Sequence, residues 1–310
     1  MSALPNRAVL GYEPLATPDD YDDFWGTALE EGRSHPLAIR RDAVECRLES
    51  IDVYDLSFAG AGGRRVDAWL RLPRTRTDRL PAVVHANGYG AGRLDPIDDL
   101  TWAAAGYAHL VIGTHGQGGG SSGHLLENVT VPERSYYRDV FVDAARAVEV
   151  VRTLDEVDPV RVAMIGNSQG GGIALGVGAL VPDLRAVLAQ SPFLTDAPGA
   201  LRRATDGPWL ELREYLLDYP DRAGLVAKTL SYVDGVTSAR QAVAPGWISA
   251  GLDDTICPPE TARSAADAYA SRVEYREWPG AGHEAGGTAD RRRALTALHE
   301  TMAIKRTHTQ

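Results

Sequence analysis

The sequence predicts an α/β fold in which helices cover both faces of a mostly parallel β-sheet. Short apolar runs of strand length recur between segments with helical periodicity. Most of these runs lack polar alternation, which is typical of strands buried on both faces. Strand and helix then alternate along the chain, which favours a parallel sheet. The 310 residues, 44% of them hydrophobic, are enough for a large core.

Eight strands are predicted. The first two, 43–58 and 64–73, alternate in hydrophobicity around a GAGG turn, which indicates an antiparallel hairpin at the sheet edge. The six apolar runs that follow lie at 81–86, 108–113, 160–166, 185–190, 246–251 and 273–278. Helical patterns lie at 98–107, 136–154, 169–181, 259–272 and 290–303.

Two segments fall outside this alternation. Residues 17–33 begin with Thr17 as N-cap and Pro18 in the first turn, so we expect an N-terminal helix packed outside the sheet. Residues 192–243 are far longer than an ordinary connection, and their leucine and aromatic clusters predict a helical cap inserted before the strand at 246–251. We interpret residues 1–310 as one domain.

Composition excludes several classes of function. The net charge of −10 opposes binding to nucleic acid or to an anionic membrane, and favours a small neutral or cationic substrate. The apolar stretches are too short to span a bilayer, and the first residues lack a signal-peptide core, so a cytoplasmic protein is expected. Cys46 and Cys257 match neither a zinc nor a redox spacing, so no disulfide or metal is expected.

The stretch GNSQGGG at 166–172 predicts a nucleophilic serine. Ser168 lies between Gly166 and Gly170, after an apolar strand and before an apolar helix, as a strained strand-to-helix turn requires. Side chains at the two flanking positions would clash in such a turn. The alternative is a glycine-rich turn that binds phosphate or nothing.

A serine nucleophile needs a base, and this motif is followed by an acid and then a histidine. Three histidines come late enough: His283, His299 and His308. His283 lies on a glycine-containing loop after the last strand, whereas His299 falls within a helical pattern and His308 in the polar tail. We therefore predict His283 as the base; the alternative is an ordinary loop histidine.

The acid is expected where GLDDTICPP follows the strand at 246–251. We favour Asp254, with Asp253 as the second choice, and the carboxylate would orient the imidazole and stabilise its cation. The alternative role for Asp254 is to cap the helix that follows.

Two backbone amides are expected to receive the oxyanion. One belongs to Gln169, directly after the nucleophile, and the other to Tyr89 in the loop NGYGAGR after the strand at 81–86. Glycines in that loop allow the backbone to approach a substrate, although NGYG could also be a plain turn.

With these residues, the chain resembles the acetyl xylan esterase and cephalosporin C deacetylase family, carbohydrate esterase family seven, of the α/β-hydrolase fold. The resemblance covers nearly the whole chain. It runs through PDDYDDFWGTALEE, NGYGAGR, HGQGGGSSG, RSYYRDVFVDAARAVE, GNSQGGGIAL, LSYVDGVTSA, GLDDTICPP and GHE, in the family's order. It implies the same assignments: Ser168, Asp254 and His283 as triad, with the amides of Tyr89 and Gln169 as oxyanion donors.

The family resemblance also implies hydrolysis of small acetate esters by cytoplasmic proteins that assemble as hexamers. Two departures bear on the alcohol side of the substrate. The family's Arg-Gly-Gln-Gly reads His115-Gly116-Gln117-Gly118 here, and Asn87 stands where a histidine commonly precedes the oxyanion glycine. His115 and Gln117 either brace the loop or contact substrate.

The expected function is therefore a serine esterase that removes acetyl groups from small acetylated sugars or related alcohols, without a cofactor. One alternative is another acyl hydrolase or acyltransferase, such as a peptidase or thioesterase, because the triad does not determine the substrate. The other is a binding module that keeps the fold without the chemistry.

Overall fold

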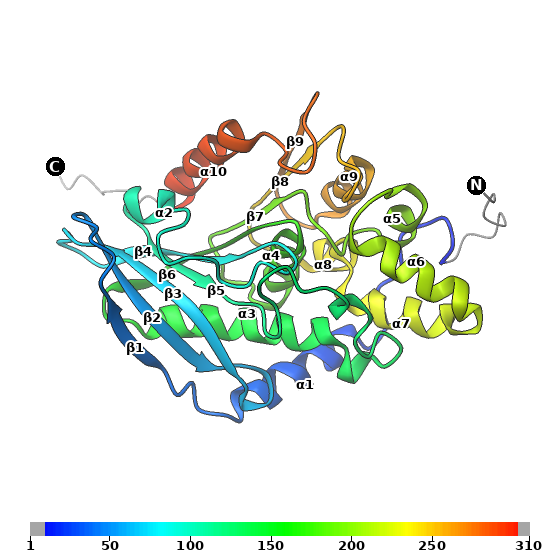
Figure 1. Ribbon diagram of the computed structural model, residues 1–310, viewed down its shortest axis with the longest axis horizontal. Coiled ribbons are helices and arrows are strands. Elements are labelled where there is room, and N and C mark those ends of the chain that lie inside the picture. The colour runs from blue at the N-terminus through cyan, green and yellow to red at the C-terminus, as the bar shows by residue number, and fades with distance from the viewer. Residues whose placement is uncertain (1–9, 303–310) are drawn as a thin grey trace.

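A single β-sheet runs through the molecule (Figure 1). The structure is a computed structural model that describes residues 10–302. Within them the sheet has nine strands in the order β1-β2-β3-β5-β4-β6-β7-β8-β9. The strands are β1 (Arg40–Val44), β2 (Ile51–Ala59), β3 (Arg65–Pro73), β4 (Leu80–Ala86), β5 (Ala108–Ile112), β6 (Val157–Asn167), β7 (Ala186–Gln190), β8 (Gly246–Gly251) and β9 (Val273–Trp278). The six strands β4 to β9 pair parallel with one another. β1, β2 and β3 pair antiparallel, and β3 joins the parallel strands through an antiparallel pairing with β5, so the predicted α/β class is confirmed.

The predicted count of eight strands is wrong by one. Residues 43–58 are not one strand but the end of β1 and most of β2, which pair antiparallel with Val44 opposite Val53. The chain reverses between them at Arg47, whose φ is 54° and whose N–H donates to the Glu45 carboxylate at 2.8 Å. No glycine or proline marks this turn, so the alternating pattern runs through it unbroken.

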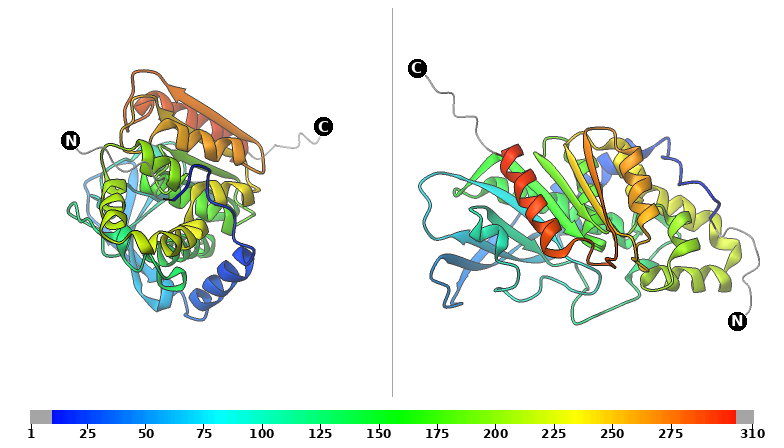
Figure 2. Two further views of the ribbon diagram at one scale, coloured as in Figure 1. Left: turned by 90° about the vertical axis from the view of Figure 1, so that its right-hand side faces the viewer. Right: turned by 90° about the horizontal axis from the view of Figure 1, so that it is seen from above.

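Helices cover both faces of the sheet (Figure 2). They are α1 (Tyr21–Arg33), α2 (Thr101–Ala104), α3 (Tyr136–Thr153), α4 (Gln169–Leu180), α5 (Ala197–Arg203), α6 (Pro208–Asp218), α7 (Ala223–Val233), α8 (Gly235–Gln241), α9 (Pro259–Ala268) and α10 (Gly287–Met302). Neighbouring side chains of β4 join different cores: Val84 packs with α3 and α4, and Val83 with Leu298 of α10. This two-sided burial explains why the parallel strands lack polar alternation.

The N-terminal helix lies against α3, outside the sheet, as expected (Figure 1). It begins at Tyr21 rather than at residue 17, because residues 18–20 form a turn and Asp20 occupies the N-cap position. Trp25 stacks on Phe141 of α3 with ring centroids 5.5 Å apart, and its indole N–H donates to the Tyr232 carbonyl oxygen at 3.2 Å. The helix thereby joins α3 to the inserted segment.

The segment 192–243 is helical, as predicted, and contains α5 to α8. α6 and α7 extend beyond one end of the sheet (Figure 1). α8 is different: it packs between α4 and α9 in the layer that covers the sheet. The segment is therefore partly an extension and partly a piece of the main helical layer.

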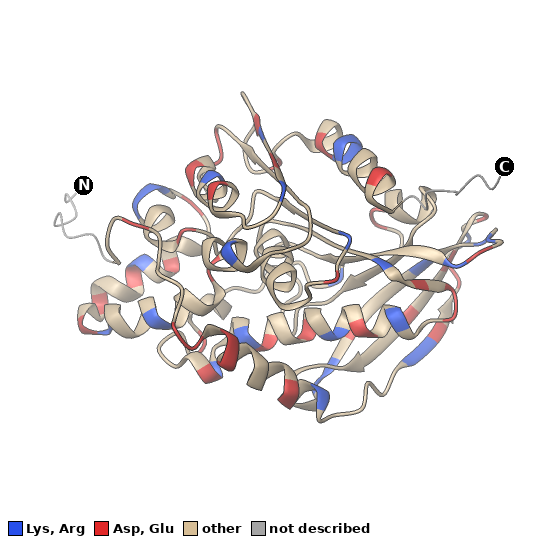
Figure 3. Ribbon diagram, turned by 180° about the vertical axis from the view of Figure 1, so that it is seen from behind, with Lys and Arg blue, Asp and Glu red and all other residues tan. Residues whose placement is uncertain are grey.

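Acidic and basic residues are interspersed along the exposed helices and do not gather into one basic patch in this view (Figure 3). In the described part of the chain, no helix combines the length and hydropathy needed to cross a bilayer.

Candidate active site

Ser168 lies at the junction of β6 and α4 in a strained backbone conformation. Its φ is 54° and its ψ −121°, a region that L-residues rarely adopt. A Cβ added at Gly166 would lie 2.1 Å from the Gly170 oxygen, and one at Gly170 would lie 1.9 Å from the Ala86 oxygen. Only glycine fits at either position, which is the steric requirement expected of a nucleophile turn.

The strained turn is held by backbone hydrogen bonds from three directions. The Ser168 N–H donates to the Gln190 oxygen at 2.9 Å. The Ser168 oxygen accepts from the N–H groups of Gly172, at 3.1 Å, and Phe193, at 2.9 Å. The serine is therefore fixed against the end of β7 as well as to its own helix.

His283 and Asp254 form a hydrogen-bonded pair. His283 Nδ1 lies 2.8 Å from Asp254 Oδ2, and Asp254 Oδ1 accepts from the N–H groups of Ile256 and Cys257, each at 2.9 Å. The Asp254 side chain is fully buried and His283 is partly exposed. Asp253, the second choice from the sequence, is exposed to solvent, so the structure pairs the imidazole with Asp254.

Ser168 and His283 come from loops at the same edge of the sheet. Gln190 links these loops: its oxygen accepts from the Ser168 N–H, and its side-chain amide donates to the Glu284 oxygen at 2.6 Å. No hydrogen bond joins the Ser168 hydroxyl to His283 in residues 10–302. Such bonds are often long in ligand-free enzymes and shorten when substrate binds.

Of the other histidines, His299 lies in α10, and His308 lies outside the described residues.

The two expected oxyanion donors flank the serine. Gln169 is the first residue of α4, and Tyr89 follows Gly88, where an added Cβ would lie 3.8 Å from the Ser168 Cβ. Within residues 10–302, neither backbone N–H of this pair donates to another protein group. Free amides at a helix start and a neighbouring loop suit an anionic oxygen.

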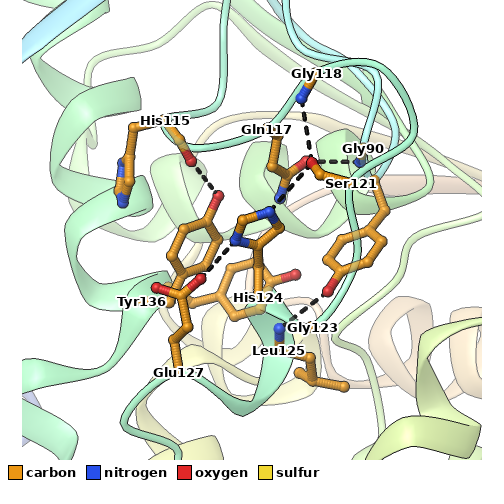
Figure 4. Close-up of polar contacts among 12 residues, drawn as sticks. Gly90, His115, Gln117, Gly118, Ser121, Gly123, His124, Leu125, Glu127 and Tyr136 are labelled. Atoms are coloured by element: carbon orange, nitrogen blue, oxygen red, sulfur yellow. Dashed lines mark hydrogen bonds and ion pairs between the residues drawn. The ribbon is translucent and has the colours of Figure 1, made fainter.

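The side chains of Gln117 and Gln169 form a reciprocal amide pair. Gln117 Nε2 donates to Gln169 Oε1 at 2.7 Å, and Gln169 Nε2 donates to Gln117 Oε1 at 3.0 Å. Gln117 Oε1 also accepts from the Gly90 N–H at 2.7 Å (Figure 4). Gly90 follows Tyr89, so one amide pair connects the two loops that carry the expected oxyanion donors. From the sequence, Gln117 was expected either to contact substrate or to brace the loop. Its side chain bonds to protein groups that brace the loop.

His115 also contacts protein groups. Its Nδ1 lies 2.8 Å from Asp143 Oδ2, and Asp143 Oδ1 accepts from the Ala61 N–H at 2.7 Å. Burial raises the pKa of the Asp143 carboxyl above its ordinary value, and the His115 hydrogen bond acts in the opposite direction. The His115 carbonyl accepts from the Tyr136 hydroxyl at 2.6 Å (Figure 4). These contacts brace the loop, and Asp143 was not anticipated because it lies within a helical pattern.

A cluster around Tyr89 was also missed from the sequence. The Tyr89 hydroxyl accepts from the Leu125 N–H at 3.1 Å, and burial raises the pKa of Tyr89 to about 12. His124 lies edge-on to the Tyr89 ring at 6.0 Å; its Nδ1 lies 2.5 Å from Glu127 Oε1 and its Nε2 lies 3.2 Å from Ser121 Oγ (Figure 4). The HGQGGGSSGH run could have suggested a structured loop, but not this partner set.

One group of three side chains in the described residues could hold a metal ion. The ligand atoms of Asp254, Cys257 and His283 lie within 4.8 Å of one another. Burial raises the pKa of the Cys257 thiol well above its ordinary value, with a smaller contribution from Asp254. The thiol therefore stays protonated near neutral pH, and the other two side chains already bond each other.

A serine in a strained turn after a central parallel strand, with a histidine–aspartate pair on loops at the same sheet edge, defines the α/β-hydrolase class. The comparison with known proteins is more specific. The chain belongs to the acetyl xylan esterase family, whose model matches residues 2–300.

Relatives agree with this assignment. The acetyl xylan esterase from Paenibacillus sp. R4 superposes with a TM-score of 0.88 at 30% identity, covering 96% of this chain and 100% of that one. Acetyl xylan esterase 1 from Thermoanaerobacterium sp. JW/SL YS485 has a TM-score of 0.85 at 28% identity, covering 97% and 99%. The acetyl esterase Axe7A of Xylanibacter ruminicola is 26% identical over 262 residues, 79% of this chain; the match spans 58% of that relative's length.

Proposed function

We propose that the protein is a serine esterase that removes acetyl groups from small acetylated sugars or related alcohols. The observation that carries the proposal is the constellation around Ser168: a strained nucleophile turn, two free amides beside it, and a His283–Asp254 pair on the neighbouring loops. Membership of the acetyl xylan esterase family supports the acetyl group as the acyl part.

In the proposed mechanism, His283 acts as base through Nε2. Its Nδ1–H donates to the Asp254 carboxylate, which leaves the Nε2 lone pair free to take the Ser168 hydroxyl proton. Ser168 Oγ then bonds to the acetyl carbon, and the carbonyl oxygen becomes an oxyanion held by the amides of Tyr89 and Gln169. When this intermediate collapses, the ester C–O bond breaks and the alcohol leaves with the proton from His283.

Water completes the cycle. His283 takes a proton from water, whose oxygen attacks the acetyl-serine carbon, and the same two amides hold the second oxyanion. Collapse returns the proton to Ser168 Oγ and releases acetate. Each half-reaction is balanced, because His283 ends in the protonation state in which it began.

We propose that packed aromatic side chains near the nucleophile turn limit the pocket to a small acyl group. The Phe193 N–H is bonded to the Ser168 oxygen, and the Phe193 ring lies 4.7 Å from Trp209 and 6.3 Å from Tyr89, centroid to centroid. Rings held by one another cannot move aside easily for a long chain.

The proposal is tested by acetate release from acetylated xylose, cephalosporin C and aryl acetates. We expect Ser168→Ala to lower kcat by about 10³-fold or more while the protein stays folded. Nitrophenyl butyrate and octanoate should be cleaved much more slowly than the acetate. Equal rates for all three chain lengths would instead favour a thioesterase or general acyl hydrolase.

A fluorophosphonate probe separates an enzyme from a hydrolase-like binding module. Labelling of the intact protein that is lost in Ser168→Ala supports the enzyme. An unlabelled intact protein would favour the binding module. By family resemblance, we also propose a cytoplasmic homo-oligomer that requires no cofactor.

A further inference from the structure

The Tyr89 side chain is held at its hydroxyl end and along its ring. The hydroxyl accepts from the Leu125 N–H at 3.1 Å. The ring centroid lies 6.0 Å from that of His124 and 6.3 Å from that of Phe193. A ring packed in this way restricts rotation of the backbone that carries it, and so keeps the Tyr89 N–H in one direction. That N–H is one of the two oxyanion donors in the proposed mechanism.

The Leu125 N–H belongs to a compact turn at 121–127. The His124 ring stacks on Tyr136 of α3 with centroids 5.1 Å apart, and both ring nitrogens contact side chains of the same turn (Figure 4). The Leu125 side chain is buried. The turn is therefore fixed on α3 and can hold the Tyr89 hydroxyl in place.

The chain that leads into this turn is rich in glycine. Five of the eight residues 116–123 are glycine, so this stretch loses much conformational freedom when it is ordered. Its last residue is held from outside: the Gly123 N–H donates to Glu211 Oε2 at 3.2 Å. Glu211 lies on α6 of the segment 192–243, and α6 packs on the turn. The inserted segment thus anchors the entry to the turn.

Glu211 is partly buried and lies near the other groups of this cluster. Burial raises the pKa of its carboxyl above the ordinary value, whereas the Gly123 N–H and then His124 act in the opposite direction. Burial raises the pKa of Tyr89 to about 12; the Leu125 N–H opposes this rise, and the charge of Glu211 adds to it. The carboxylate therefore interacts with both ends of the path from Gly123 to Tyr89.

We propose that Glu211 is a positioning residue for the oxyanion donor Tyr89, and that the inserted segment acts on catalysis through it. Glu211 fixes the Gly123 N–H, and two residues later the Leu125 N–H fixes the Tyr89 hydroxyl. The Tyr89 amide is thereby directed before substrate arrives, which is the preorganisation that an oxyanion site needs. The inference rests on the proposed function, because it takes this amide as an oxyanion donor.

The test measures kcat and KM for nitrophenyl acetate with the full-length protein. We expect Glu211→Ala to lower kcat by about fivefold, the effect of one lost hydrogen bond, and to change KM by less than about twofold. KM is spared because the oxyanion forms only in the transition state. Glu211→Gln keeps a carbonyl oxygen for the Gly123 N–H, so its kcat should stay within about twofold of the unmodified value. Glu214→Ala removes an exposed glutamate one turn further along α6 and should leave both constants unchanged.

A double-mutant cycle tests the path itself. Tyr89→Phe removes the acceptor of the Leu125 N–H and should also lower kcat by about fivefold. The double variant with Glu211→Ala should be little worse than either single variant, because both changes release the same anchor. Thermal unfolding of each variant separates a misdirected amide from a lost fold. If Glu211→Ala does not fold, Glu211→Gln and Tyr89→Phe decide the outcome.

Four results would overturn the inference. They are an unchanged kcat in Glu211→Ala, a loss in Glu211→Gln as large as that in Glu211→Ala, additive losses in the double variant, and a rise in KM without a fall in kcat. The last result would mean that Glu211 contacts the substrate. An active esterase that shows any of them would refute this inference alone. An unmodified protein that releases no acetate would refute the proposed function, and this inference with it.

Discussion

Asp253 and Asp254 are adjacent in the chain but have opposite environments. Asp254 is buried and accepts from His283 and two backbone N–H groups, whereas Asp253 is exposed. Chain order alone leaves both as acids for the triad, because each follows β8 closely. Burial is the property that separates them, since an oriented carboxylate needs fixed donors around it.

We expect Asp254→Asn to lower kcat by about 10³- to 10⁴-fold, because an amide favours the wrong imidazole tautomer and cannot stabilise the imidazolium. Asp253→Asn, the matched control, should change kcat by less than about twofold. The measurement is nitrophenyl acetate hydrolysis under saturating substrate. If Asp254→Asn lowered kcat no more than Asp253→Asn does, the hydrogen bond between His283 and Asp254 would have no catalytic role.

At the scale of elements, the Gln117–Gln169 pair joins the loop after β5 to the start of α4 and, through Gly90, to the loop after β4. We expect Gln117→Ala and Gln169→Ala each to lower kcat by about tenfold or more, because the two oxyanion amides lose their common support. Since the side chains act as one unit, the double variant should be little worse than either single one. Additive losses in this double-mutant cycle would show that the residues act independently.

Asp234 connects two helices of the inserted segment. It caps α8 through the Val236 N–H at 2.8 Å and accepts from the Ala197 N–H, at the start of α5, also at 2.8 Å. Burial raises the pKa of Asp234 from 3.8 to about 6, while these backbone donors act in the opposite direction. The folded state therefore binds the proton more tightly than the unfolded state does.

A raised carboxyl pKa contributes stability below pH 3.8 that is lost as the pH rises through about 6. We expect the unfolding free energy of the unmodified protein to fall relative to Asp234→Asn between about pH 4 and pH 7, by up to about 3 kcal/mol. Urea unfolding of both proteins across this range measures the difference. Parallel pH profiles would show that Asp234 ionises with its unfolded-state pKa.

For the whole molecule, the sequence predicted features that neighbouring residues determine better than contacts between residues far apart in the chain. The turn at Ser168 was predictable because its glycine requirement is set within five residues, and the α/β class because buried parallel strands have a recognisable pattern. The break at Arg47 escaped because the turn contains neither glycine nor proline. Asp143 escaped, and so did the buried row of Arg71, His109 and His85, whose side chains lie within hydrogen-bond distance of one another. The role of each side chain depends on partners 24 to 38 positions away in the chain.

One exposed apolar surface bears on the oligomeric state of the protein. The tip formed by the end of α6 and the start of α7 exposes Leu217, Tyr219 and Leu225, each with 43% to 52% of its surface accessible. Clustered exposed apolar residues mark contact sites between proteins. Because the family resemblance implies hexamers, we propose this tip as a contact between copies.

We expect light scattering after size exclusion to give about 200 kDa, six copies of a 33.3 kDa chain. Leu225→Glu should reduce this mass, because a carboxylate at the tip would have to be buried without a partner. Val160→Glu, at an exposed apolar position near the start of β6 and away from the tip, is the control and should keep the assembly intact; 68% of the Val160 surface is accessible, against 52% for Leu225. A monomeric unmodified protein would refute the hexamer, whereas a hexamer unaffected by Leu225→Glu would place the contact on another surface.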